Sequence, residues 1–484
     1  MSLHCMDLFC GAGGMSLGLR RSGFELAGGF EWNDTAGKTY QNNLAMNSAG
    51  KVAGFGKEQG DISALDFGLI QEQLSTQGIH RLDLLAGGPP CQGFSVAGRG
   101  KVASLDDDDR AFATDSRNDM VHHFCRAVET LRPRAVLMEN VTGMLNLDGF
   151  NHADVVCQRL MDAGYSVRLT VLNAAWYGVP QNRERLFIMA LAPGESVAGS
   201  HWFPSPVHEG RSWTSSIGRQ MLEQAHFTDT SVLEKHWPGP ECHPPVTVAM
   251  ALDDLPSFTC HLDDPEYRAS RELHDMMAYP DDVDPDSYAH QMRFWDDTCV
   301  SAGVSDHFCR NTPRDFRIFE QMEHGDRYPR AVEIAAQLYR DAVSNWDRTP
   351  GTPQPHHQDY IPPYPLGGFD ERWQKLDPNR PSWTVTAHLS RDCYSHIHHD
   401  SDQARTISIR EAARLQSFPD AYHFHGSMGD CYRQIGNAVP PLLARALGYS
   451  LKAHLEQTPV LKKTRVSGKI WRSSGTWSRI HKNS

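Results

Sequence analysis

The chain has 484 residues, of which 40% are hydrophobic and 22% are charged, and its formal net charge at pH 7 is −12. This length predicts two or three domains, and the composition is ordinary for a soluble globular protein. The sequence shows neither a signal-peptide pattern nor an apolar run of roughly 18 residues, so we expect a cytoplasmic protein that does not enter a membrane.

The cysteines and the C-terminal charges add two expectations. Eleven cysteines are scattered without a CxxC pair, which predicts free thiols in a reducing compartment and no structural zinc. The negative net charge argues mildly against nucleic acid as a partner, but the distribution of charge matters more than its total. Residues 461–484 carry seven Lys and Arg residues and no acid, which predicts a solvated basic tail or a non-specific phosphate contact.

Residues 1–191 alternate short apolar runs with amphipathic stretches. Strands are predicted over Leu3–Phe9, Phe24–Trp32, Asp83–Gly88, Ala135–Asn140, Ser166–Asn173 and Arg185–Leu191, and helices over Met15–Arg21, Met120–Leu131 and Asp154–Ala163. Strands that alternate with helices predict an α/β fold with a doubly wound, mostly parallel sheet and helices on both faces.

Beyond residue 191 the pattern changes. Proline becomes frequent, predicted helices are short, and residues 349–368 hold six prolines and three glycines, which indicates a loop or linker. Helical spacing returns over Ile409–Ser417 and Pro440–Leu455. We therefore divide the chain into a first part of the sheet domain (1–191), a smaller irregular domain (192–405), a hinge and helix returning to the core (406–433), a C-terminal part of the sheet domain (434–460) and a tail (461–484).

The first chemical signal is a glycine loop between a strand and a helix, Asp7-Leu-Phe-Cys-Gly-Ala-Gly-Gly14. Glycines allow a tight turn and close approach of a ligand, and amides at a helix start can bind a carboxylate or a phosphate. Glu31, at the end of the second strand, can accept hydrogen bonds from both ribose hydroxyls. Together these residues predict a site for a nucleoside cofactor, either a dinucleotide or S-adenosylmethionine.

A weaker signal follows in Gly60-Asp61-Ile62, where a third strand region is expected to end. Asp61 could accept from an adenine amino group, and Ile62 could pack on the ring. A surface acid beside a buried isoleucine is the more common meaning of such a pair.

The most specific segment is Gly87-Gly-Pro-Pro-Cys-Gln-Gly-Phe-Ser95, which follows a predicted strand. Two prolines fix the chain just before Cys91, at the carboxyl edge of the sheet, where ligands bind in open α/β folds. A structural cysteine is normally packed inside a strand or helix. A cysteine on a rigid turn is therefore better explained as a nucleophile.

Charged residues follow at the same edge. Glu139 ends a predicted strand, and a carboxylate in a closed pocket can carry a raised pKa and donate a proton. Arg183 and Arg185, within Gln181–Arg185, lie on one side of an extended segment. One of them could face a base and the other a carboxylate or phosphate.

Taken in order, these segments resemble the motif set of the DNA cytosine-5 methyltransferases. The resemblance rests on Asp7–Gly14, Gly87–Ser95, Glu139–Val141, Gln181–Arg185 and Gln434–Pro441, with Glu31, Asp61 and Arg410–Pro419 in support. It covers roughly residues 3–191 and 405–450, while residues 192–400 match only in their place and in Pro-Ser-Trp-Thr-Val-Thr386. It implies the Rossmann-like fold of S-adenosylmethionine-dependent methyltransferases, with residues 192–405 as target-recognition domain.

The resemblance also implies a reaction, the transfer of a methyl group from S-adenosylmethionine to carbon 5 of a flipped cytosine in duplex DNA, in an enzyme of the bacterial or phage restriction-modification type. Cys91 would add to carbon 6 and make carbon 5 nucleophilic. Glu139 would hold the N3 edge and donate a proton. Arg185, with Arg183 beside it, would hold the base oxygen and stabilise negative charge.

Further contacts are assigned by the same resemblance. The expected cofactor contacts are Phe9, Gly11, Gly13, Gly14, Glu31, Trp32, Asp61, Ile62, Pro90, Asn437 and Ala438. The expected contacts with the base or the DNA are Gln92, Ser95, Arg99, Asn140, Gln181, Thr384 and Thr386. We expect no metal site and a monomer, with a cognate restriction or defence-system protein left open as a partner.

Two features of the chain have no assigned chemistry. The polar loop between Ser95 and Asn118 suits a lid over the DNA, and we expect its acidic run Asp106–Asp109 to point into solvent. A set of histidines is expected to be surface or phosphate-facing rather than metal-binding: His356, His357, His396, His398 and His399.

Three alternatives stay open. A tRNA cytosine-5 methyltransferase would use the same catalytic set, although such enzymes usually have a smaller second domain and differ at Gly93–Ser95. A catalytically dead DNA-binding or regulatory protein is disfavoured by the intact Cys91, Glu139 and Arg185. A nicotinamide-dependent dehydrogenase would explain the glycine loop but not the Pro-Pro-Cys segment.

Overall fold

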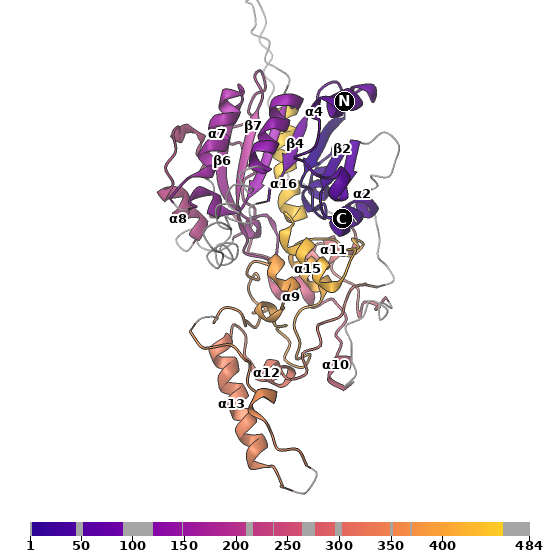
Figure 1. The fold of residues 1–484 in the computed structure, drawn as a ribbon, viewed down its shortest axis with the longest axis vertical. Coiled ribbons are helices and arrows are strands. Elements are labelled where there is room, and N and C mark those ends of the chain that lie inside the picture. The colour runs from indigo at the N-terminus through magenta and orange to yellow at the C-terminus, as the bar shows by residue number, and fades with distance from the viewer. Residues whose placement is uncertain are drawn as a thin grey trace, which may run out of the picture.

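The structure is a computed structural model that describes residues 2–44, 52–90, 120–147, 149–209, 216–235, 237–263, 276–295, 303–348, 352–367 and 370–457. The molecule is elongated, with a sheet and its helices at one end and helix α13 (Tyr328–Ser344) at the other (Figure 1). Within these ranges no helix combines the length and apolar character needed to cross a membrane. The cysteines that the structure describes are free thiols.

The centre of the first body is a seven-stranded sheet in the order β3-β2-β1-β4-β5-β7-β6. Its strands are β1 Leu3–Leu8, β2 Phe24–Glu31, β3 Val52–Phe55, β4 Leu84–Gly87, β5 Ala135–Asn140, β6 Ser166–Asn173 and β7 Glu184–Leu191. Neighbours from β3 to β5 pair in parallel, and β7 is antiparallel to both β5 and β6. The predicted mostly parallel α/β fold is confirmed. The carboxyl ends of β1, β2, β4 and β5 and the start of β7 share one edge.

Helices cover both faces of this sheet (Figure 1). Helices α1, α2 and α16 pack on one face, and α4, α7 and the helical residues 120–131 pack on the other. The helices are α1 Gly14–Arg21, α2 Asp34–Leu44, α3 Gly56–Gln59, α4 Phe67–Thr76, α7 His152–Asp162, α8 Ile217–Gln224, α9 Val248–Leu252, α10 Cys260–Asp263, α11 Tyr288–Arg293, α12 Phe316–Gln321, α13 Tyr328–Ser344, α14 Ile409–Leu415, α15 Met428–Asn437 and α16 Pro441–Glu456. Short 3₁₀ turns include η2 Ala174–Tyr177 and η7 Ala387–Ser390.

The C-terminal helices pack against the first body. A Cβ built on Gly18 of α1 would lie 2.4 Å from the carbonyl oxygen of Pro441, so the backbones of α1 and α16 touch directly. Helix α14 begins with a capping box, in which Ser408 and Glu411 satisfy each other's backbone amides. These local devices fix where the chain rejoins the sheet.

A second, smaller core lies at the other end of the molecule. Residues of α12 and α13 pack there with Trp373, Ile397 and Ala404. By contrast, Trp202 and Leu222 still belong to the cores on the sheet. The domain boundary expected at residue 192 stays a prediction. The sequence predicts target recognition in this part of the chain, so we call the described residues from Phe316 to Trp373 around this core the recognition body.

Two local predictions need correction. The third strand ends at Phe55 and is followed by α3, so Gly60–Ile62 comes after a helical turn rather than directly after a strand. Helix α13 has 17 residues, longer than the short helices expected in this region. The prediction of short helices rested on the frequent prolines beyond residue 191, which hid the helical spacing of the hydrophobic residues in α13.

Candidate active site

Backbone amides tie the glycine loop to the end of β2. Gly11 donates its N–H to Glu31 Oε2 at 2.9 Å, and Asn33 donates to Glu31 Oε1 at 2.8 Å. Phe9 and Gly11 have positive φ angles of 59° and 54°, which turn the chain sharply after β1. Glu31 is thereby fixed at the carboxyl edge of the sheet, and its oxygens keep lone pairs for further donors.

The loop leaves room for a ligand beside this carboxylate. A Cβ built on Gly11 would meet no atom within 4 Å. Burial raises the pKa of Glu31, and the amide donors from Asn33 and Gly11 oppose that shift. Open space next to a held carboxylate suits a polar ligand with hydroxyl donors, such as a ribose.

The other loop glycines are packed tightly. A Cβ on Gly13 would lie 2.7 Å from Leu44 Cδ1, and one on Gly14 would lie 2.3 Å from Val439 O and 3.1 Å from Ala438 Cβ. No side chain fits at such distances. The structure thus brings the predicted C-terminal residue Ala438 against the glycine loop.

The expected adenine contacts differ in how much surface they offer. Trp32 is 53% exposed, and the Lys57 ammonium lies 5.3 Å from its ring centroid. Asp61 is half-buried and accepts from Ser63 N and Oγ. Ile62 is only 2% exposed and belongs to a core on the sheet. Trp32 and Asp61 can meet a ligand, whereas Ile62 is mainly a core residue.

Asp7 forms a buried polar group beneath the loop that received no role from the sequence. Its Oδ2 accepts from Ser16 Oγ at 2.5 Å, and Ser16 Oγ lies 2.8 Å from the Tyr40 hydroxyl. Asp7 Oδ1 has no hydrogen-bond partner among the described residues. Burial raises the pKa of Asp7 to about 7. The available signal was a single acid within the mostly apolar strand β1.

The base side of the candidate site is built on β5 and β7. Arg185 Nε lies 3.2 Å from Glu139 Oε1. A Cβ built on Gly88 would lie 3.2 Å from Glu139 Oε2. Glu139 therefore stands between Arg185 and the segment Gly88–Pro90, which leads directly into Cys91.

Opposing effects act on the Glu139 carboxyl group. Burial raises its pKa, and the guanidinium groups of Arg185 and then Arg183 oppose the shift. Asn140 stabilises the neighbouring turn, because its Nδ2 donates to Pro89 O at 3.4 Å and its Oδ1 accepts from Val141 N at 2.8 Å. The raised pKa favours the protonated carboxyl group, which can donate a proton.

Arg183 points elsewhere. Its side chain is 1% exposed, and its guanidinium donates to Val385 O at 2.8 Å and to Gly436 O at 3.0 Å. Since both terminal nitrogens are bound to carbonyls in the interior, this placement corrects the expectation that Arg183 holds a base oxygen. Arg185 alone forms the pair with Glu139.

Gln181 needs a similar correction. It was expected to contact the DNA, but it is fully buried and accepts from Val385 N at 2.9 Å while donating to Leu415 O at 3.0 Å. Thr384 Oγ1 donates to Asn182 O at 2.9 Å, so this hydroxyl is also used within the protein. Thr386 and Asn437 are exposed and remain accessible to a ligand.

Several predicted features lie outside the described residues. They are Cys91, Gln92, Ser95, Arg99, the loop with Asp106–Asp109 and the basic tail 461–484. Their roles stay predictions.

The histidines divide into two groups. His356 and His357 are exposed and His399 is half-buried, but His396 and His398 are buried, which corrects their assignment to the surface. Burial lowers the pKa of each of these two to about 4. Among the described residues, no group of three or more His, Cys, Asp or Glu could hold a metal ion.

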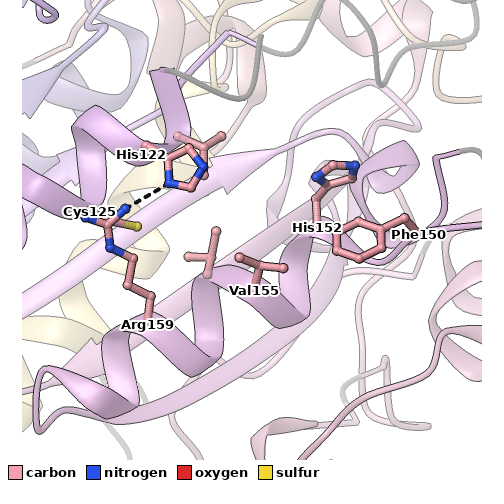
Figure 2. A pocket seen from close by; sticks show the side chains of 8 residues that line it. His122, Cys125, Phe150, His152, Val155 and Arg159 are labelled. Carbon is pink, nitrogen blue, oxygen red and sulfur yellow. Dashed lines mark hydrogen bonds between the residues drawn. The ribbon is translucent and has the colours of Figure 1, made fainter. Parts of the chain in front are cut away.

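A hollow of about 210 Å³ between residues 120–131 and α7 is separate from the candidate site. Figure 2 shows Arg159 bonded to His122 on one side of it and Phe150 beside His152 on the other. It contains none of the loop, carboxylate or arginine residues described above.

Comparisons with known proteins agree with this geometry. The model of the C-5 cytosine-specific DNA methylase family matches residues 3–453. A relative from Oceanobacillus iheyensis, by name the type II methyltransferase M.OihORF3336P, is 34% identical, covering 93% of this chain and 95% of its own. The type II methyltransferase M.AgeI of Thalassovita gelatinovora is 31% identical, covering 93% of this chain and 99% of its own.

One solved structure supports the fold. A chain named as a DNA modification methyltransferase encoded within an E. coli prophage has 22% identity and a TM-score of 0.58, and the match covers 94% of this chain and all of that one. The residues around the loop also fit the family's cofactor: the open space at Gly11, the carboxylate of Glu31 and the exposed ring of Trp32 suit the ribose and adenine of S-adenosylmethionine. The chain belongs to the C-5 cytosine-specific DNA methylase family, and it is a DNA (cytosine-5)-methyltransferase that uses S-adenosylmethionine.

Proposed function

We propose that this enzyme methylates a cytosine within a specific duplex DNA sequence, by extruding the base and joining Cys91 covalently to carbon 6. The observation that best supports this proposal is the Glu139–Arg185 pair, which lies against the Gly88–Pro90 segment leading into Cys91. The glycine loop follows β1, and β1 pairs directly with β4. A cytosine and a methyl donor can therefore meet above neighbouring strands.

The reaction needs a nucleophile because carbon 5 of cytosine does not attack a methyl group unaided. The Cys91 thiolate adds to carbon 6, and the electron pair of the 5,6 double bond becomes available at carbon 5. Bound S-adenosylmethionine supplies a methyl group on a positively charged sulfur. Loss of the carbon 5 proton to a base then restores the double bond and expels the thiolate.

Glu139 and Arg185 stabilise the ring while it carries the adduct. We assign Glu139 as the group that donates a proton at N3, since burial raises its pKa. We assign Arg185 to the base oxygen, where its charge offsets the negative charge that builds on the ring. Asn140 and Pro90 shape the pocket, and Gln92, Ser95 and Arg99 are proposed to contact the DNA.

The cofactor side is assigned to the loop and its neighbours. Phe9, Gly11, Gly13 and Gly14 would line the methionine part, and Glu31 would accept from the ribose hydroxyls. Trp32 and Asp61 would contact adenine. The exposed Asn437, next to Ala438, would close the pocket from the C-terminal side.

We assign DNA recognition to residues 192–405, with the recognition body at their far end and the exposed Thr386 where the chain returns to the sheet domain. Because the curated relatives M.OihORF3336P and M.AgeI are type II methyltransferases by name, we also propose that the enzyme protects DNA against a cognate restriction endonuclease. It would act as a monomer in the cytoplasm.

The test is methyl transfer from labelled S-adenosylmethionine to unmethylated plasmid DNA and, in parallel, to tRNA. We expect label in DNA alone, recovered as 5-methyldeoxycytidine at one sequence. Label in tRNA alone would favour the RNA alternative. Activity retained by Cys91→Ser would remove Cys91 from the mechanism.

A further inference from the structure

A seam of buried hydrogen bonds joins the chain returning from the recognition body to the segment before β7. Ser382 N donates to Pro180 O at 3.0 Å, and Asn182 N donates to Ser382 O at 2.7 Å. Next to them, Gln181 Oε1 accepts from Val385 N at 2.9 Å. The contact connects residues about 200 positions apart in sequence.

Arg183 extends this seam to a third segment. Its Nη1 donates to Val385 O at 2.8 Å and its Nη2 donates to Gly436 O at 3.0 Å. Gly436 itself is pressed against the returning chain, because a Cβ on it would lie 2.2 Å from the carbonyl carbon of Thr386. One guanidinium thus links the segment before β7, the returning chain and the end of α15.

Both ends of this link lie close to the candidate site. Arg185, which pairs with Glu139, follows Arg183 after a single residue on the same chain. Ala438, which lies against Gly14, is two positions beyond Gly436. Gln416 reinforces the second end, because its Nε2 donates to Ala438 O at 2.6 Å.

The charge of Arg183 is costly where it sits. Burial lowers its pKa well below the usual range, Arg185 acts in the same direction, and Glu139 opposes them from a distance. Only backbone carbonyls accept its side-chain bonds among those resolved here. A buried cation without a bonded carboxylate is weak evidence of stabilisation, so its geometry is the better reason for its presence. The planar fork of arginine can hold two carbonyls at fixed positions, which a lysine cannot do.

We propose that Arg183, with Gln181 beside it, is a positioning residue. By binding the chain that returns from the recognition body, Arg183 holds both the base-side pair Glu139–Arg185 and the cofactor-side turn Gly436–Ala438 in place. It touches neither substrate nor cofactor. This inference rests on the proposed base pocket. It implies that the base side and the cofactor side of the site are aligned only when the chain returning from the recognition body is bound in its place.

The experiment compares full-length wild type with Arg183→Lys, Thr384→Val and Gly436→Ala. Thr384→Val removes only the hydroxyl bond to Asn182 O. Two quantities are measured: turnover on unmethylated plasmid DNA, and the Kd for S-adenosylmethionine without DNA. The matched control is Arg159→Lys, in an arginine bound to Glu129 at the separate hollow.

For Arg183→Lys we expect kcat to fall about tenfold or more and the cofactor Kd to rise about threefold or more, as for a lost charged hydrogen bond. Thr384→Val should shift both in the same direction by a smaller factor. Arg159→Lys should stay within about twofold. The double variant Arg183→Lys/Gly436→Ala should be no worse than the poorer single variant, because both break the same link.

Wild-type kcat and Kd in Arg183→Lys, with only a lower melting temperature, would overturn the proposal, as would additive losses in the double variant. If Arg183→Lys does not fold, Thr384→Val decides, and unchanged values there would also overturn it. If wild type itself does not methylate the plasmid, the proposed substrate fails, while the cofactor Kd still reports on Arg183.

Discussion

The Arg185 guanidinium lies 3.2 Å from the Glu139 carboxylate, measured from Nε to Oε1, where β5 and β7 adjoin at the edge of the sheet. The pair brings a cation and a proton-donating group to the segment that leads into the proposed nucleophile. It defines the base side of the site as the loop around Glu31 defines the cofactor side.

Glu139→Gln tests the proton-donating role. The amide keeps a similar shape but cannot give up a proton to the ring, so we expect kcat to fall by about 100-fold or more, as for loss of a general acid. The Kd for S-adenosylmethionine should stay near that of wild type. Steady-state methylation assays measure both. The control is Glu129→Gln, which removes the carboxylate that pairs with Arg159 of α7, away from the candidate site. An equal loss of kcat in this variant would indicate general destabilisation.

Glu31→Ala tests the cofactor side. The substitution removes the acceptor for the Gly11 and Asn33 amides and for the ribose, so the KM for S-adenosylmethionine should rise about tenfold or more. At saturating cofactor, kcat should recover most of its value. The control is Glu25→Ala at the other end of the same strand, where the side chain is 63% exposed. An unchanged KM would remove the ribose assignment.

Gly18→Ala tests the contact between α1 and α16. Alanine is favoured over glycine inside a helix by about 1 kcal/mol, so a gain in stability is expected if space exists. The new Cβ would instead lie 2.4 Å from Pro441 O, and we expect a lower melting temperature in thermal unfolding. Gly239→Ala, where a Cβ meets nothing within 4 Å, should be neutral. A stabilised Gly18→Ala protein would contradict the close packing.

Stability should fall in acid through buried histidines. Burial lowers the pKa of His307, His396 and His398 to about 4, below the ordinary value of 6.5. The unfolded chain therefore binds protons first, so stability is full above about pH 6.5 and is lost as the pH falls toward 4. Urea unfolding at several pH values measures this. His396→Asn should reduce the slope, and the exposed His357→Asn should leave it unchanged.

Much of the fold could be read from the sequence because its strands have sharp boundaries. Ala135–Asn140 and Ser166–Asn173 were predicted with their observed bounds, since the first is an apolar run that ends in polar residues and the second starts with alternating polar and apolar residues. The third strand region was predicted to end near Gly60, whereas β3 ends at Phe55, and the helix α2 was not predicted. Their hydrophobic patterns are weak, and their packing against β2 depends on contacts that sequence spacing does not reveal.

The candidate site was predicted in part. The glycine loop, Glu31 and Glu139 come at strand ends, so topology alone brings them to one edge. The alternation of Arg183 and Arg185 suggested a shared role, but Arg183 lies just before β7 and Arg185 lies within it. Arg183 turns inward to carbonyls from segments over 200 residues away, which no local pattern could indicate.

The most direct test of the account is covalent trapping. Pure protein is incubated with labelled S-adenosylmethionine and duplex DNA containing 5-fluorocytosine, then run on a denaturing gel. Fluorine replaces the carbon 5 proton whose loss frees the enzyme, so we predict a stable labelled protein–DNA adduct in wild type and none in Cys91→Ala. An adduct that persists in Cys91→Ala, or the absence of any adduct with DNA that wild type methylates, would contradict the central claim.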